Sequence, residues 1–201
     1  MINSSATKLS LTNNSLPSCS ASSSFLCCYY QNVRGLCTKT RELYLSLMSE
    51  THLKLIALSE TWLHNGIKDE ELIDVAKFNV YRKDRNFKAC KCVRGGGVLL
   101  AVDRTISSSI CDNPMCNNIC DILPTIDLLL IKINFNSRTI YVLVIYIPPQ
   151  CDNNDYVIFF DFLLSMSFLY ESQLIIFGDF NCPEFIRDTS SITLPTIPHQ
   201  C

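Results

Sequence analysis

The sequence predicts an α/β domain built on buried sheets, and three observations support this prediction. Of the 201 residues, 48% are hydrophobic and 18% are charged, which is typical of a globular chain. Runs of Leu, Ile and Val with the length of buried strands recur along the chain, and helical segments are interleaved with them. The length supports one ordinary domain with a core of its own.

The expected elements begin at Phe25. The predicted strands are the apolar stretches FLCCYY, LKLIAL, GGGVLLAV, DLLLIKI, TIYVLVIY and QLIIFGDF. Helical spacing of Leu43 and Leu47 predicts a helix over TKTRELYLSLMSE. The greasy run 156–170 predicts a second helix that faces the core, because it is too short to span a bilayer and contains Asp161.

The two ends of the chain differ from this pattern. Residues 1–24 are crowded with Ser, Thr and Asn and contain no acidic residue, so we expect a disordered tail. We expect the folded domain over 25–187 and an irregular C-terminal tail over 188–201.

The charge and the cysteines narrow the class of protein. The net charge of -2 gives no global basic field, although a local patch and metal ions can still hold a nucleic acid. The 12 cysteines include no C-x-x-C pair, and no apolar signal region precedes Cys27. We therefore expect reduced thiols and no zinc site. We also expect an intracellular protein, nuclear or cytoplasmic, that is neither secreted nor bound to a membrane.

Polar side chains follow three of the apolar strands. Asn32 ends the first, Glu60 ends the second, and Asp179 and Asn181 end the last. In α/β sheets ligand sites lie at the carboxyl ends of strands, so these side chains predict one shared site. The alternative for Asp179 and Asn181 is a plain turn, because Gly, Asp and Asn all favour turns.

The chemistry of this set suits a metal ion and a phosphate. Glu60 and Asp179 carry the hard oxygen ligands that Mg²⁺ takes, and Mn²⁺ is a possible substitute. Asn32 and Asn181 can donate hydrogen bonds or complete the metal shell. Tyr146 follows an apolar strand, and its hydroxyl is expected to point at the same phosphate.

Two further segments lie between these strands. YRKDR offers Arg82, Lys83 and Arg85 as contacts for nucleic-acid phosphates, with ordinary surface charge as the alternative. The glycines of RGGGV suit a tight turn or a close backbone approach. Trp62 is expected to pack in the fold rather than to stack on a base.

Six segments in this order, QNVRGL, SETWL, YRKDR, GGGV, YIPP and GDFN, resemble the endonuclease/exonuclease/phosphatase superfamily. More narrowly, residues 26–185 resemble the apurinic-like endonuclease domain of jockey-type LINE (non-LTR) retrotransposons. The resemblance implies a two-layer sheet sandwich flanked by helices. It also implies an enzyme that nicks DNA and leaves a 3′-hydroxyl, from which a reverse transcriptase domain of the full-length element primes synthesis.

The resemblance also implies a role for each site residue. Asn32 would lie near the metal and Glu60 would be the principal Mg²⁺ ligand. Tyr146 would contact the scissile phosphate, while Asp179 and Asn181 would orient the attacking water and the substrate.

One family feature is missing. Family members carry a Ser-Asp-His segment near the end of the domain, and His199 lacks the preceding Ser-Asp. The chain is therefore expected to be a truncated copy without the last strands of the fold, with impaired activity. The alternatives are a catalytically dead remnant and a phosphatase or phospholipase of the same superfamily.

Overall fold

The computed structural model describes residues 5–9, 25–48, 50, 52–85, 95–111, 119, 122–166 and 172–182. The helices and strands, in chain order, are β1 (Ser5–Leu9), β2 (Leu26–Asn32), α1 (Thr40–Met48), β3 (Leu55–Ser59), the 3-10 helix η1 (Asp69–Glu71), β4 (Phe78–Lys83), β5 (Val98–Asp103), β6 (Ser107–Ile110), β7 (Asp127–Phe135), β8 (Arg138–Tyr146), α4 (Asn153–Ser165) and β9 (Gln173–Asp179).

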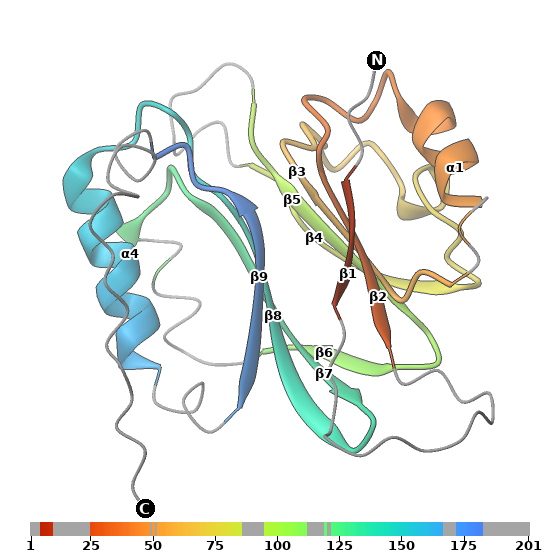
Figure 1. The fold of residues 1–201 in the computed structure, drawn as a ribbon. Coiled ribbons are helices and arrows are strands. Elements are labelled where there is room, and N and C mark those ends of the chain that lie inside the picture. The colour runs from red at the N-terminus through yellow and green to blue at the C-terminus, as the bar shows by residue number, and fades with distance from the viewer. Residues whose placement is uncertain are drawn as a thin grey trace, which may run out of the picture.

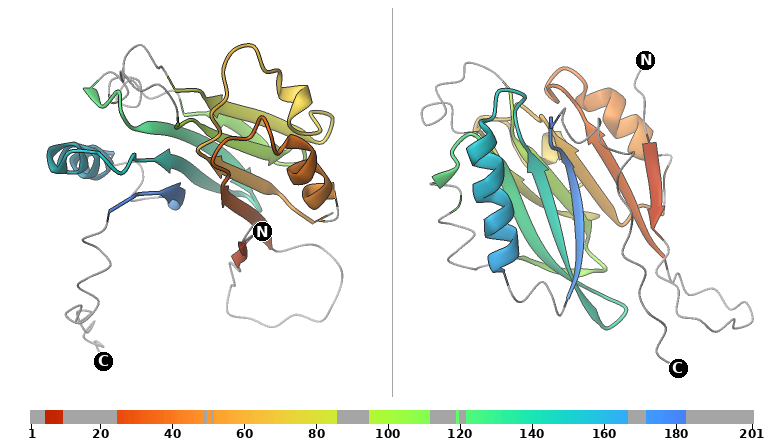
Figure 2. Two further views of the ribbon diagram at one scale, coloured as in Figure 1. Left: turned by 90° about the horizontal axis from the view of Figure 1, so that it is seen from above. Right: turned by 60° about the vertical axis from the view of Figure 1, so that its left-hand side comes forward.

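The strands form two sheets that pack face to face (Figures 1 and 2). The first sheet has five strands in the order β1-β2-β3-β5-β4, and the second has four in the order β6-β7-β8-β9. Each sheet mixes parallel and antiparallel pairs, since β2 runs parallel to β3 and β8 parallel to β9. Helix α1 covers the outer face of the first sheet and α4 that of the second (Figure 1). The predicted α/β class and sandwich are confirmed.

The central strands are buried on both faces, and this explains their unbroken apolar sequences. On β8, Val142 and Val144 join the cluster between the two sheets. Their neighbours Leu143 and Ile145 point the other way and join the cluster beneath α4. Both faces therefore need large apolar side chains.

The six predicted strands and both predicted helices are present. The second helix begins earlier than predicted, because Asp152 is its N-cap and accepts a hydrogen bond from the Asn154 amide at 2.9 Å. Its last described helical residue is Ser165, and residues 167–170 of the predicted helix lie outside the described residues.

Three strands were not predicted. Ser5–Leu9, within the expected tail, forms β1 and pairs antiparallel with β2. Strand β4 ends in two basic residues, and β6 is mostly serine, so neither has an apolar run.

The expected C-terminal tail, residues 188–201, lies outside the described residues. In the described part of the chain, no helix is long and apolar enough to cross a membrane.

Candidate active site

The structure brings together the polar groups that follow the strands. Asn32 is the last residue of β2, and Glu60 follows β3, the parallel neighbour of β2. Asp179 is the last residue of β9, in the opposite sheet. Because the sheets face each other, side chains 147 positions apart in sequence come into hydrogen-bonding contact at one end of the sandwich.

One amide joins the two carboxylates. Asn32 Nδ2 donates to Glu60 Oε1 and to Asp179 Oδ2, each at 2.8 Å. The two acceptor oxygens therefore lie no farther apart than twice this distance. The loop after β2 fixes the amide, because the backbone amide of Arg34 donates to Asn32 Oδ1 at 3.2 Å.

The two carboxylates fit a divalent cation. Among the described residues, no lysine, arginine or histidine pairs with Glu60 or Asp179, so two like charges face each other without a protein counter-ion. Two carboxylate groups with room for water are the donors that Mg²⁺ usually takes. The set is sparse, because the described ranges contain no group of three or more His, Cys, Asp and Glu suited to a metal.

The backbone that carries Glu60 is held in an unusual conformation. Glu60 and Trp62 both have a φ of 54°, in the left-handed region that residues other than glycine rarely adopt. Hydrogen bonds hold this segment from two sides: Gly35 N donates to Glu60 O at 2.8 Å, and Trp62 N donates to Gly96 O at 2.9 Å. Strain of this kind persists only where the surroundings impose it, and it gathers at functional sites.

At two positions beside this segment, a positive φ and a close neighbour require glycine. Gly35 has a φ of 91°, and a Cβ atom there would lie 2.5 Å from the Trp62 ring. Gly97 has a φ of 84°, and a Cβ atom there would lie 2.6 Å from Thr61 Oγ1. The close approach predicted for the GGGV glycines is therefore present, and the Trp62 ring packs against the fold as expected.

Asp179 and Asn181 form a turn as well as part of the site. Asn181 N donates to Asp179 Oδ1 at 3.1 Å, and Asn181 Nδ2 donates to Ile147 O at 2.8 Å. Helix α4 supports this turn, because Tyr156 Oη donates to Phe180 O at 2.7 Å. The other Asp179 oxygen accepts from Asn32, so these residues form the turn that was one alternative and also meet Asn32, while their catalytic roles stay a prediction.

Tyr146 lies beside Asp179 in the second sheet. The two residues are register partners on β8 and β9. Burial raises the pKa of Tyr146 to about 12, with the Glu60 charge adding to the rise and the Arg85 charge opposing it. The phenol is therefore protonated at neutral pH and is a hydrogen-bond donor.

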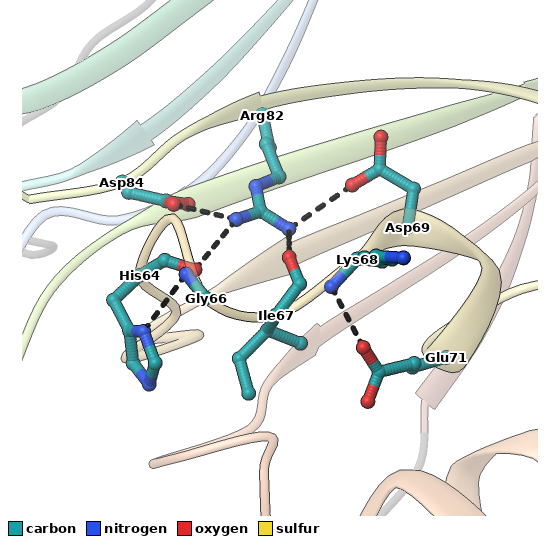
Figure 3. Close-up of polar contacts among 8 residues, drawn as sticks. All are labelled: His64, Gly66, Ile67, Lys68, Asp69, Glu71, Arg82 and Asp84. Carbon is teal, nitrogen blue, oxygen red and sulfur yellow. Dashed lines mark hydrogen bonds and ion pairs between the residues drawn. The ribbon is translucent and has the colours of Figure 1, made fainter.

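The three predicted phosphate contacts differ in their surroundings. Arg82 donates to the carbonyls of His64 and Ile67 and to the carboxylates of Asp69 and Asp84 (Figure 3). Arg85 also has a protein partner, because it donates to Asp127, and it is only 6% exposed.

In contrast, Lys83 is exposed at the end of β4. Both arginines thus have protein partners, and of the three residues Lys83 is the one accessible to a DNA backbone. The phosphate-contact role of all three stays a prediction.

Sequence reasoning missed several neighbours of the site. Tyr30 Oη lies 2.9 Å from Ser59 Oγ, and the Tyr30 ring stacks on Phe177 of the opposite sheet at 6.1 Å. Tyr30 precedes Asn32 by two residues, so strand periodicity could have placed it on the same face. Arg34 is exposed and lies two residues after Asn32, and its place within the QNVRGL segment was the available signal.

Comparisons with known proteins agree at the level of the fold. The sequence matches no family model and no curated protein. Among solved structures, the chain is similar to the endonuclease domain of TRAS1, a telomere-specific non-LTR retrotransposon, with 13% identity and a TM-score of 0.50. It is also similar to the APE2 catalytic domain of Xenopus laevis, with 18% identity and a TM-score of 0.50.

Each of these alignments covers 77% of this chain and 58% of the other. The chain thus spans less than two thirds of each of these two structures. At these identities the likeness shows a shared fold, and the fold expected from the sequence motifs is confirmed.

Proposed function

We propose that this chain is a divalent-metal-dependent DNA endonuclease domain of a non-LTR retrotransposon, which nicks target DNA and leaves a 3′-hydroxyl. The observation that carries this proposal is the single Asn32 amide that joins Glu60 and Asp179 at one end of the sandwich. The likeness of the fold to the TRAS1 endonuclease domain supports the retrotransposon class.

Different residues of the chain have different roles in phosphodiester hydrolysis. Glu60 and Asp179 would hold Mg²⁺ or Mn²⁺. When bound, the ion supplies positive charge that stabilises the phosphate and the leaving oxygen. Asn32 keeps the two carboxylates at a fixed separation, which pre-organises the site.

Tyr146 and the turn after β9 act on the substrate. The protonated Tyr146 hydroxyl donates to a phosphate oxygen, on which negative charge grows in the transition state. Asp179 accepts a hydrogen bond from the attacking water and orients it, and Asn181 holds the turn that aims this carboxylate. Proximity and electrostatic stabilisation then account for the rate enhancement.

The partners follow from the chemistry. The substrate is DNA, bound through exposed cations that include Arg34, two residues after Asn32, and Lys83 at the end of β4. A reverse transcriptase domain of the same element would use the 3′-hydroxyl. Such a protein acts inside the cell, in the nucleus or the cytoplasm.

A plasmid assay tests the proposal. The 201-residue chain is incubated in excess over supercoiled DNA with Mg²⁺, Mn²⁺ or EDTA, beside Asp179→Asn and the control Asp161→Asn on the exposed surface of α4. In keeping with the impaired activity expected from the sequence, we expect slow metal-dependent nicking, detectable at this excess of protein, that leaves ends a polymerase can extend. This nicking should be lost in Asp179→Asn and retained in Asp161→Asn. No metal-dependent nicking, nicking by Asp179→Asn at the wild-type rate, or hydrolysis of a phosphate monoester in place of DNA would overturn it.

A further inference from the structure

A buried ion pair lies directly behind Tyr146. Arg85 Nη2 and Nε donate to Asp127 Oδ2 at 2.6 and 2.9 Å, and Arg85 Nη2 also donates to Thr125 O at 2.9 Å. The side chains of Arg85 and Asp127 are 3% and 5% exposed. The Arg85 guanidinium carbon lies 5.2 Å from the centre of the Tyr146 ring, a cation–π distance.

The strand register puts this pair in line with the candidate site. Asp127 on β7 is the register partner of Tyr146 on β8, and Tyr146 is the register partner of Asp179 on β9. Side chains at such positions share one face of a sheet, here the face toward the first sheet. Asp127, Tyr146 and Asp179 therefore form a row that leads from the buried pair to the carboxylates.

The same pair also reaches the segment that carries Glu60. Gly97 N donates to Asp127 Oδ2 at 2.9 Å, and Gly97 O accepts from Thr61 N at 3.2 Å. Thr61 directly follows Glu60 in the chain. Asp127 thus joins the ring of Tyr146, through Arg85, to the backbone beside Glu60.

Stability alone does not explain a buried pair at this position. Desolvation of two charges opposes their attraction, and apolar replacements of such pairs are often neutral or stabilising. The Arg85 guanidinium is planar and carries several donors. It can therefore donate to Asp127 and to the Thr125 carbonyl while it lies against the Tyr146 ring.

We propose that the Arg85–Asp127 pair positions the Tyr146 ring so that its hydroxyl meets the scissile phosphate, an inference that rests on the endonuclease function proposed above. Arg85 is then a positioning residue that acts through Tyr146, and it does not contact DNA. This differs from the phosphate contact that its sequence motif suggests.

A double-mutant cycle on nicking separates positioning from general support of the fold. Arg85→Lys, which keeps the charge and loses the planar group, should lower the single-turnover rate by about 10–100-fold, as small misplacements of catalytic groups do. The DNA concentration for half-saturation should not change. In a Tyr146→Phe background, adding Arg85→Lys should cost no more than about twofold, because its effect passes through the missing hydroxyl.

Two further variants guard against simple misfolding. Arg85→Met with Asp127→Leu removes the pair without leaving one buried charge, and it should show the same loss of rate and the same cycle. Asp103→Asn is the matched control, since Asp103 is also nearly buried, is paired with Lys54, and lies at the opposite end of β5 from Gly97. This control should nick at the wild-type rate.

A measurement without catalysis completes the test. In chains labelled with 3-fluorotyrosine, the Tyr146 resonance is the one that Tyr146→Phe removes, and Arg85→Lys should shift or broaden it while Asp103→Asn should not. An unmoved resonance, or equal loss of rate from Arg85→Lys with and without the Tyr146 hydroxyl, would overturn the positioning role. If Arg85→Lys moves the Tyr146 resonance but the wild-type chain nicks no DNA, the positioning of the ring is supported and the proposed function is refuted instead.

Discussion

Replacing Glu60 by Gln should have opposite effects on stability with and without metal. In the metal-free chain, Glu60 and Asp179 are two negative charges bridged by the same Asn32 nitrogen at 2.8 Å. At a separation of about 5 Å and an effective dielectric constant of 20–80, their repulsion is about 1–3 kcal/mol. The variant removes this repulsion but weakens one charged hydrogen bond by about 1 kcal/mol, so its unfolding free energy should rise by about 0–2 kcal/mol.

With metal, the order should reverse. At a Mn²⁺ concentration about 100 times the dissociation constant, binding stabilises the wild type by about 2.7 kcal/mol. Because Glu60 is one of only two carboxylate ligands, its loss should weaken binding by about 100-fold or more, the upper end of what loss of an outer partner costs. A 100-fold weaker site gains only about 0.4 kcal/mol at the same concentration. The stability of the variant should therefore fall below that of the loaded wild type.

Urea unfolding with and without Mn²⁺ measures both effects. Trp62 is the one tryptophan of the chain and lies two residues from Glu60, so its fluorescence reports on this segment directly. Glu42→Gln, an exposed change on α1, is the control and should match the wild type in both conditions. Equal metal-induced gains in Glu60→Gln and wild type would refute the assignment of Glu60 as a ligand.

Three further predictions concern other parts of the site and the fold. Tyr146→Phe should lower the nicking rate by about 10²–10³ and leave Mn²⁺ affinity unchanged in a calorimetric titration. Arg34→Ala should weaken DNA binding in fluorescence anisotropy and reduce the salt slope of binding by about 1. The control Arg138→Ala, at the end of β8 opposite to Tyr146, should change neither quantity. Burial favours a higher pKa for Asp103, but hydrogen bonds from Thr105 and Lys54 outweigh it and hold the pKa below 3.8. This contribution to stability is present above that pH and is lost as pH falls through the folded pKa, so Asp103→Asn should flatten the acid side of the stability curve.

The strands and their polar ends could be predicted because both follow local rules. Strands buried on two faces are continuous apolar runs, and a polar residue directly after such a run lies at a sheet edge. Asn32, Glu60 and Asp179 fit this pattern and do meet in the structure. The start of α4 could also have been predicted from the sequence, since Asp152 is a typical N-cap residue.

What could not be predicted depends on partners that are distant in sequence. The YRKDR motif suggests a basic patch, yet Arg85 pairs with Asp127, 42 residues away. Strand β6 has no apolar pattern, and it forms because β7 offers it a partner. The left-handed backbone of Glu60 is imposed by neighbouring loops rather than by its own residue type.

The candidate site is built by the closure of the sandwich and does not belong to either sheet alone. Asn32 and Glu60 come from the first sheet, and Asp179 comes from the second, so the Asn32–Asp179 hydrogen bond crosses the gap between them. Beneath it, the Tyr30 ring on the first sheet stacks on Phe177 of the second. Any change that shifts one sheet against the other therefore alters the separation of the carboxylates, and metal affinity should report the packing of this core.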